Sequence, residues 1–256
     1  MLSELTADAV SDADARREAR PLVEVEAAAL ARTPAIDALA ALAPGERVKV
    51  IAEIKRSSPS RGSLAPIVDP AALARSYELG GASAISVLTE GRRFGGSLAD
   101  LEAVRAAVAL PVLRKDFIAT PYQVLEARAS GADLVLLIVA ALDDARLAEL
   151  YALVTELGMA ALVETHSAEE LDRAAQLGAR LIGVNARDLS TFELDRDLFG
   201  RIAERFPDDA IRVAESAVLS ADDVAHYRRS GADVVLVGEA LVTGDPIANL
   251  SAFLAV

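Results

Sequence analysis

The sequence predicts a closed barrel of eight parallel strands, a (β/α)8 or TIM barrel, with a helical extension before the first strand. Eight short apolar runs recur along the chain, and segments of helix length separate them. The runs are rich in Val, Ile, Leu and Ala without polar alternation, which is typical of strands buried on both faces. Such strands are parallel and carry helices outside, and eight of them close a barrel. An open, doubly wound sheet has a similar pattern and is the competing architecture.

The apolar runs define the predicted strands. They span residues 48–54, 84–88, 111–113, 134–139, 160–163, 181–184, 211–214 and 234–237. Most end at, or just before, a residue that can do chemistry or hold a ligand. Because the carboxyl ends of barrel strands meet at one face, these scattered polar residues should form one site.

The segments between the strands have the start and stop signals of helices. Helices are expected at about 69–79, 97–107, 121–130, 143–157, 167–177, 196–205, 220–230 and 246–254. Asp69 and Thr120 each precede a proline, as an N-cap residue does. Ser167 and Glu170 have the spacing of a capping box. Glycines close several segments, and we expect the reversing glycine after the first of these helices at Gly80.

Residues 1–47 precede the first strand and are predicted to form the helical extension of a barrel at residues 48–256. A helix is expected over residues 2–31, interrupted near Pro21, and a shorter one over residues 34–43. The extension must bury its apolar faces, and we expect it to pack over one end of the barrel. The 256 residues fit one barrel domain, although two smaller domains are also compatible with that length.

Composition excludes several classes of function. A net charge of −13, a pI near 4.7 and the lack of any Lys/Arg block argue against a nucleic-acid partner. The absence of cysteine excludes disulfides and thiolate chemistry. The two histidines, His166 and His226, are isolated and predicted to be structural, so we expect no metal. Lacking a membrane-length apolar span or a leader pattern, the sequence predicts a cytoplasmic protein with no membrane association.

Two lysines at strand ends are candidates for catalysis. Glu53 and Lys55 lie two residues apart in a strand and should point to the same side. Such a lysine needs a partner, so this pair is either a structural ion pair or a catalytic or phosphate-facing group. Lys115 ends the third run, with Arg114 and Asp116 expected to face the helices. Burial and a second lysine would lower its pKa, making it a general acid or a Schiff-base amine.

Polar residues also follow the fifth and sixth strands. Glu164 ends the fifth run, and Asn185 and Arg187 follow the sixth. A carboxylate can transfer protons, and a guanidinium suits a carboxylate of the substrate. Each residue could be structural, but their shared place at strand ends favours a common site.

The loops after the seventh and eighth strands predict a phosphate site. Ser216 follows the seventh strand, and Gly238 precedes a short helical turn at residues 239–242. Barrels often bind phosphate with these loops and the start of a small helix. The loop at residues 57–62 offers further hydroxyl and amide groups.

At this point the chain resembles the indole-3-glycerol-phosphate synthases, over about residues 45–250. The matching segments are IAEIKRSSPSRG (51–62), SVLTEGRRFGGS (86–97), LRKDFIATPY (113–122), ALVE (161–164), IGVNARDL (182–189), VAES (213–216) and VLVGEALV (235–242). The resemblance implies a lyase of tryptophan biosynthesis that needs no cofactor. It converts 1-(2-carboxyphenylamino)-1-deoxyribulose 5-phosphate to indole-3-glycerol phosphate by ring closure, decarboxylation and dehydration. The substrate is thus a small phosphorylated molecule, and other enzymes of the pathway are conceivable partners.

The resemblance also implies the site residues. The catalytic set is Glu53, Lys55, Lys115, Glu164, Asn185, Glu215 and Ser216, and the substrate-binding set is Ser58, Pro59, Phe94, Phe117, Leu136, Arg187, Ala217, Gly238 and Glu239. Lys115 resembles the acid that protonates the ribulose carbonyl, and Lys55 the residue that meets a substrate anion and assists dehydration. Glu53 and Glu164 are similar to the acid/base carboxylates.

One residue departs from the family pattern. Ser216 is followed by Ala217, where the family usually has glycine. Alanine keeps the amide but restricts φ, so we expect phosphate affinity to fall by at most about tenfold.

Two other functions are compatible with a barrel of this kind. A phosphoribosyl isomerase would need a carboxylate pair across the barrel mouth and no equivalent of Lys115. A barrel that has lost turnover would not need to retain Glu53, Lys55, Lys115, Glu164 and Asn185, all of which are present.

Overall fold

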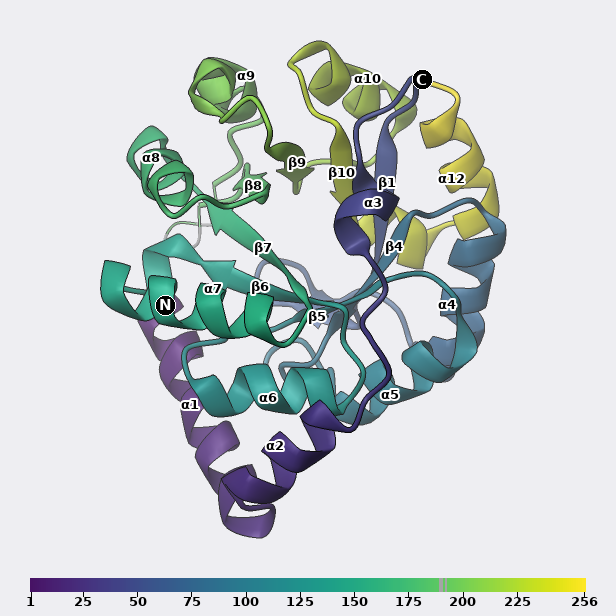
Figure 1. Ribbon diagram of the computed structural model, residues 1–256. Coiled ribbons are helices and arrows are strands. Elements are labelled where there is room, and N and C mark those ends of the chain that lie inside the picture. Colours follow the sequence, from purple (N-terminus) through teal and green to yellow (C-terminus); the bar gives the residue numbers. More distant parts are fainter. Residues whose placement is uncertain (189–190, 192) are drawn as a thin grey trace.

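Strands alternate with helices along the whole barrel region of the structure, a computed structural model that describes residues 1–188, 191 and 193–256 (Figure 1). Within these residues, eight parallel strands form a closed barrel. They are β1 (Lys49–Ile54), β4 (Ala84–Leu88), β5 (Val112–Lys115), β6 (Leu134–Ile138), β7 (Ala160–Thr165), β8 (Leu181–Asn185), β9 (Ile211–Glu215) and β10 (Val234–Val237). Because β1 pairs with both β4 and β10, the ring is closed, which confirms the barrel and excludes the open sheet.

The strands match the predicted runs closely and differ mainly at their carboxyl ends. β5 reaches Lys115, which lies opposite Leu88, and β7 reaches Thr165, which lies opposite Val184. The ladder therefore continues into the polar residues that follow the apolar runs. As a result, Lys115 and Glu164 are strand residues whose direction is set by the pleat of the strand.

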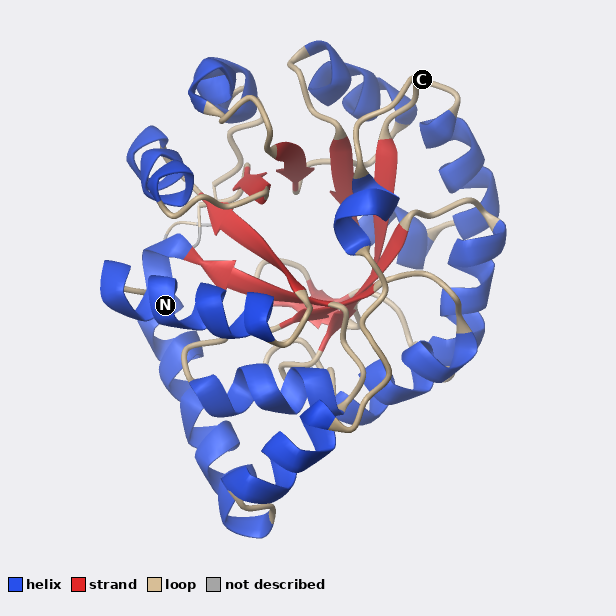
Figure 2. Cartoon of the chain, in the orientation of Figure 1, coloured by secondary structure: helices blue, strands red, loops and turns tan. Residues whose placement is uncertain are grey.

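Helices surround the strands, as Figure 2 shows. They are α4 (Pro70–Leu79), α5 (Leu98–Ala107), α6 (Pro121–Ala129), α7 (Asp144–Glu156), α8 (Ala168–Gln176), α9 (Leu198–Ile202), α10 (Ala221–Arg229), α11 (Glu239–Thr243) and α12 (Pro246–Leu254). The 3₁₀ turns η1 (Val139–Ala141) and η2 (Ala203–Arg205) and a hairpin of β2 (Ser57–Ser58) and β3 (Gly62–Ser63) complete the connections. The helix expected at 196–205 is divided between α9 and η2.

The predicted helix signals are largely confirmed. Asp69 and Thr120 cap α4 and α6 through their side chains. The capping box at Ser167 is only half formed, because the Glu170 carboxylate accepts from the backbone of His166 instead. The expectation for Gly80 is wrong.

Gly80 is the right-handed C-cap residue of α4, with φ −73°. The chain reverses one residue later, at Gly81, with φ 92°. In this motif the left-handed residue is the one after the cap.

The extension forms α1 (Leu2–Ala19), α2 (Leu22–Leu30) and α3 (Ala38–Leu42), with the predicted break at Pro21. α3 lies across one opening of the barrel in Figure 1, and its fully buried Leu42 packs in the cluster that contains Leu181, the first residue of β8. α1 lies at the other end, where Leu5 lines a pocket. The extension therefore contacts both ends of the barrel, not one as expected.

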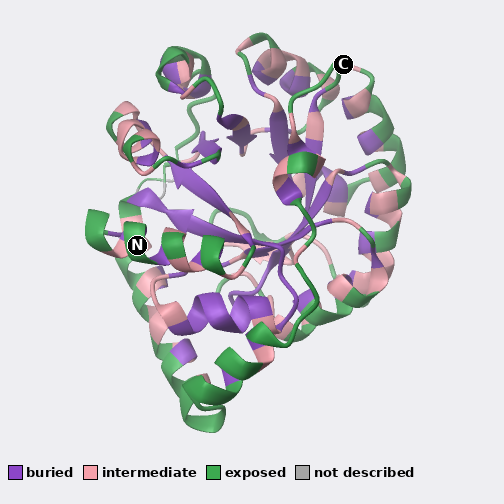
Figure 3. Cartoon of the chain, in the orientation of Figure 1, coloured by how far each residue is buried: buried purple, intermediate pink, exposed green. Residues whose placement is uncertain are grey.

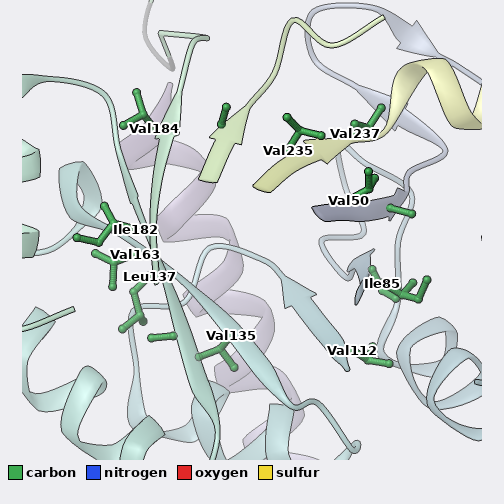
Figure 4. Close-up of a cluster of buried hydrophobic side chains, with 14 of the residues drawn as sticks. Val50, Ile85, Val112, Val135, Leu137, Val163, Ile182, Val184, Val235 and Val237 are labelled. Atoms are coloured by element: carbon green, nitrogen blue, oxygen red, sulfur yellow. The ribbon is translucent and has the colours of Figure 1, made fainter. Parts of the chain in front are cut away.

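Apolar side chains fill both faces of the barrel wall, whose strands are mostly buried in Figure 3. Outward-facing residues pack against the helices, and Figure 4 shows Val50, Ile85, Val112, Val135, Leu137, Val163, Ile182, Val184, Val235 and Val237 of this layer. The alternate residues form the cluster inside, with Ile51, Leu113 and Leu162 among them. Two positions further along the same strands, the inward-facing residues become charged.

Candidate active site

A pocket opens at the carboxyl ends of the strands, and all the residues implied by the family resemblance line it. They are Glu53, Lys55, Ser58, Pro59, Phe94, Lys115, Phe117, Leu136, Glu164, Asn185, Arg187, Glu215, Ser216, Ala217, Gly238 and Glu239. Closure of the barrel thus brings residues from distant parts of the sequence to one place.

Lys115 forms the centre of a buried charge cluster. Its Nζ donates a hydrogen bond to Oε2 of Glu164 at 3.1 Å and lies 3.6 Å from Oε2 of Glu215. Burial alone lowers the pKa of Lys115, but Glu164, Glu215 and Glu53 outweigh burial and hold it well above the usual value. The expected lowering of this pKa is therefore wrong. A charged ammonium favours the general-acid role over Schiff-base formation, which needs a neutral amine.

Glu164 and Glu215 form a buried pair of carboxyl groups with opposite tendencies. Burial raises the pKa of Glu164, but Lys115 and His166 lower it by a larger amount. The pKa of Glu164 therefore lies well below its usual value. Burial and the charge of Glu164 raise the pKa of Glu215 well above its usual value. The two pKa values are therefore pushed apart, so the pair favours a proton on Glu215 over one on Glu164, which suits a base beside an acid.

Gly183 provides the space for this pair and is a residue that sequence reasoning missed. It lies opposite Glu164 in the β7–β8 ladder. A Cβ atom on Gly183 would lie 2.1 Å from Oε1 of Glu215. A glycine within a strand often marks such a close approach, and this is the signal that could have identified it.

Asn185 links the carboxylates to the neighbouring loops. Its Nδ2 donates to Oε1 of Glu164 at 3.2 Å, and its Oδ1 accepts from the hydroxyl of Ser216 at 2.7 Å. The same Oδ1 accepts from the amide of Arg187 at 3.0 Å. Arg61 and Arg187 both line the pocket, so two guanidinium groups lie along its wall. Burial and the positive charge of Arg61 lower the pKa of Arg187.

Glu53 and Lys55 point to the same side, as their spacing predicts. Nζ of Lys55 donates to Oε1 of Glu53 at 2.5 Å. Gly238 allows this pair to approach β10, because a Cβ atom there would lie 2.6 Å from Oε1 of Glu53. Lys55 is therefore an ion-paired lysine at the pocket, placed where an incoming anion can compete with Glu53.

The loops after β9 and β10 have the features of an anion site. Ser216 and Ala217 have φ of 70° and 55°, in the left-handed region. The change from glycine to alanine thus falls where a side chain is strained. α11 begins at Glu239, directly after Gly238, so its first amides have no acceptor within the helix. Together these groups can hold a phosphate.

An apolar slot faces the charge cluster. The rings of Phe94 and Phe117 lie 6.1 Å apart at a tilt of 45°. The Glu90 carboxylate supports Phe94 by accepting from three successive backbone amides of its loop, the last being that of Phe94 itself. Leu5 of α1 and Ile138 complete the wall. Sequence reasoning missed Leu5, because nothing distinguishes it from the other leucines of α1.

Neither histidine is part of a metal site. His166 lies behind Glu164, with Nε2 3.2 Å from Oε1, and His226 lies near Asp197. Across the described residues, no group of three or more His, Asp or Glu side chains could hold a metal ion.

The chain matches the family model for indole-3-glycerol phosphate synthase over residues 2–252. It is 73% identical to a protein of that name from Leifsonia xyli subsp. xyli, over 99% of this chain and 97% of the relative. A second, from Mycobacterium ulcerans, is 58% identical over 94% of this chain and 89% of its own length. The matched segment at 182–189 ends at Leu189, which lies outside the described residues.

Solved structures show a related fold at low sequence identity. The N-acetylmannosamine-6-phosphate 2-epimerase from Clostridium perfringens superposes with a TM-score of 0.60 at 15% identity, covering 76% of this chain and 87% of its own. At that identity the likeness concerns the barrel alone. The match of the family model over nearly the whole sequence, together with these relatives, shows that the chain belongs to the indole-3-glycerol phosphate synthase family.

Proposed function

We propose that this pocket carries out the reaction of the family with the residues implied by the sequence. The reaction converts 1-(2-carboxyphenylamino)-1-deoxyribulose 5-phosphate to indole-3-glycerol phosphate, CO2 and water. One observation carries the assignment: Nζ of the buried Lys115 lies 3.1 Å from Oε2 of Glu164 and 3.6 Å from Oε2 of Glu215. The cluster lies under an apolar slot and beside a loop suited to phosphate.

Ring closure joins the aromatic carbon that bears the carboxylate to the carbonyl carbon of the ribulose. Lys115 donates a proton to the carbonyl oxygen, which becomes a hydroxyl, and the nitrogen becomes an iminium. The bond to the carboxylate then breaks, and its electron pair neutralises the iminium. CO2 leaves without a cofactor, because the substrate supplies its own electron sink.

Dehydration completes the indole. The hydroxyl leaves as water with a proton from Lys55, and Glu164 accepts a proton from the carbon next to the nitrogen. Glu53 holds Lys55 in place, with Nζ 2.5 Å from Oε1, and solvent at the pocket restores the proton of Lys55 after the step. Aromaticity of the new ring favours this step.

The remaining residues hold the substrate. Asn185 and Glu215 bind its hydroxyls, and Arg187 meets the anthranilate carboxylate. The slot of Pro59, Phe94, Phe117 and Leu136 takes the aromatic ring. The phosphate binds to Ser58, Ser216, Ala217, Gly238 and Glu239, the last through its amide.

An assay without added metal or cofactor tests the proposal. Indole absorbance and fluorescence should appear from the carboxyphenylamino-ribulose phosphate, and EDTA should not reduce the rate. The chain contains no tryptophan, so indole fluorescence reports the product alone. No product would refute the activity, and loss in EDTA that a divalent metal restores would refute the cofactor-free route. Turnover of a phosphoribosyl isomerase substrate instead would support that alternative, which the presence of Lys115 disfavours.

Within the described residues, no helix is long and apolar enough to cross a membrane. We place the enzyme in the cytoplasm, acting as one domain over residues 1–256, with other tryptophan-pathway enzymes as candidate partners. Packing of Leu5 into the pocket supports the single domain, because the extension then forms part of the site.

A further inference from the structure

His166 connects the charge cluster to the helix behind it. It follows β7 directly, and its ring lies between two carboxylates. Nε2 is 3.2 Å from Oε1 of Glu164, and Nδ1 is 3.2 Å from Oε2 of Glu170 on α8. The backbone amide of His166 also donates to Oε2 of Glu170, at 2.7 Å. The ring is therefore held from both sides, with its side chain 10% exposed.

The ring does not line the pocket proposed to hold the substrate. His166 is absent from the described residues that line the pocket, whereas Glu164 lines it. Glu164 presents Oε2 to Lys115 on the pocket side and Oε1 to His166 and Asn185. Glu164 is therefore the pocket residue through which the His166 ring can act on the reaction.

The environment favours a charged imidazole. Burial lowers the pKa of His166, but the contacts with Glu164 and Glu170 outweigh burial and raise it to about 10. The ionisable groups that face the Glu164 carboxylate are thus Lys115 from β5, Glu215 from β9 and His166 behind it. Glu53 from β1 acts on Lys115 and Glu215, and Glu170 from α8 acts on His166.

We infer that His166 is a positioning residue for Glu164: its ring lies between Glu164 and Glu170, holds the Oε1 side of the Glu164 carboxylate at the end of β7, and places a second basic group beside it. This inference rests on the proposed function, in which Glu164 accepts a proton. Without the imidazolium, Lys115 is the sole cation facing Glu164 among the described groups named above. The two carboxyl groups would then compete more evenly for the proton.

Two substitutions separate this role from a purely structural one. In His166→Gln, the side-chain amide reaches roughly the position of Nε2, so a neutral donor still faces Glu164. In His166→Asn, the shorter amide reaches roughly the position of Nδ1, so the donor faces Glu170 alone. Both variants remove the charge, and only the glutamine keeps a donor close to Oε1 of Glu164, where Nε2 of His166 lies at 3.2 Å in the wild type.

Steady-state kinetics across pH should show two distinct effects. In His166→Asn, kcat should fall about 10- to 100-fold with little change in KM, because a proton acceptor is misplaced. In His166→Gln, kcat at its high-pH plateau should stay within a few-fold of wild type. In both variants the acid limb of the profile should move to higher pH by about one unit, because a cation that lowers the pKa of Glu164 is gone.

Unchanged profiles and rates in both variants would overturn the inference. So would equal losses of activity and thermal stability in the two variants with the pH profile unmoved, which indicates a structural role. Glu170→Gln is the matched control: it removes the other carboxylate around the ring, leaves Glu164 intact, and should cost less than His166→Asn. An effect of Glu170→Gln as large as that of His166→Asn would assign the ring to helix anchoring instead.

A measurement independent of turnover completes the test. The chain has two histidines, so their imidazole resonances are readily distinguished by NMR. His166 should stay protonated through neutral pH in the wild type, and its titration should move to lower pH in Glu164→Gln. A wild-type ring that titrates near the ordinary value of about 6.5 would refute the inference. If the wild type makes no indole product, the proposed function fails, whereas this titration still reports the His166–Glu164 contact.

Discussion

The two halves of the barrel interior are built from the same strands but have opposite chemistry. Towards the amino-terminal ends of the strands, the inward-facing residues are Ile51, Leu113, Leu162, Leu181 and Val213, closed off by Leu42 of α3. Towards the carboxyl ends, they are Glu53, Lys115, Glu164, Asn185 and Glu215. Because side chains alternate along a strand, two residues separate most members of one layer from those of the other.

This difference indicates what each layer does. Burial of the apolar layer stabilises the fold by about 25 cal/mol for each Å² removed from water. Burial of ions costs desolvation energy, and a buried ion cluster is weak evidence for stability. Lys115, Glu164 and Glu215 are all buried or nearly so, and each faces the pocket. A role in the reaction would explain why these groups are buried in spite of their desolvation energy.

Lys115→Met breaks the charged layer and should have the largest effect. Loss of the general acid should lower kcat by about 10²–10⁴-fold. Folding and substrate binding should be largely kept, because His166 still lies 3.2 Å from Glu164 and partly compensates its charge when Lys115 is removed. Kinetics, circular dichroism and a binding titration check this prediction. More than about a tenth of the wild-type kcat would contradict the general-acid role.

Leu113→Ala is the matched change in the apolar layer, two residues earlier on the same strand and pointing the same way. The cavity should reduce the free energy of unfolding by about 2–5 kcal/mol. The kcat of the folded enzyme should change only a few-fold, because the pocket does not include Leu113 among its described lining residues. Urea unfolding followed by circular dichroism measures the first quantity. A fall in kcat comparable to that of Lys115→Met would mean that the layers are not separable.

Most of the fold was predictable because its signals are local. Apolar runs of strand length, proline after a cap residue, and glycine at the joints each report on a few neighbouring residues. The chain reversal after α4 was placed one residue too early, at Gly80, because the sequence offers two adjacent glycines that can end the helix. The extension was less predictable, since nothing in residues 34–43 indicates that Leu42 closes the barrel.

The site residues were predictable through the family resemblance, whereas their electrostatics were not. The pKa of Lys115 depends on Glu164 and Glu215, which lie far away in the sequence. Neither their distance from Lys115 nor the contact of His166 with Glu164 follows from a strand pattern. Gly183 lies within an apolar strand and is informative only once the position of Glu215 is known.

Gly183→Ala tests whether the position of the Glu215 carboxyl group depends on the absence of a side chain at residue 183. The new Cβ would lie 2.1 Å from Oε1 of Glu215, so that carboxyl group must move. We expect kcat to fall about 10- to 100-fold, as for other misplaced catalytic groups. Thermal stability should change less than in Leu113→Ala. Normal activity in this variant would show that Glu215 can shift without consequence.

Removal of residues 1–20 tests whether α1 forms part of the wall of the pocket above the charged layer. The deletion removes α1. Leu5 is then lost from the pocket wall, and Glu126 loses Arg16, one of its two arginine partners. Loss of one apolar wall residue should raise KM by about tenfold, with a smaller change in kcat. Removal of residues 1–44 should also reduce stability, because Leu42 of α3 would be lost from the opposite end. Unchanged kinetics in the shorter deletion would mean that α1 does not contact substrate.

Ala217→Gly should have the smallest effect and concerns the rim of the charged layer. Ala217 has φ 55°, and the left-handed conformation costs a residue with a side chain about 1–2 kcal/mol. Glycine removes that strain at an entropic cost of about 0.5–1 kcal/mol, so stability should stay level or rise slightly. The sequence alone suggests a small loss of heat stability, and the observed φ reverses that expectation.

Binding of indole-3-glycerol phosphate should be equal or up to a few-fold tighter in Ala217→Gly, because the loop amides can adjust to the phosphate. Calorimetry, or quenching of tyrosine fluorescence, measures the affinity. Clearly weaker binding would show that alanine is the fitted residue at this position. In that case the left-handed conformation of Ser216 and Ala217 positions the backbone amides that bind the phosphate. Relaxing this conformation would displace those amides and weaken substrate binding.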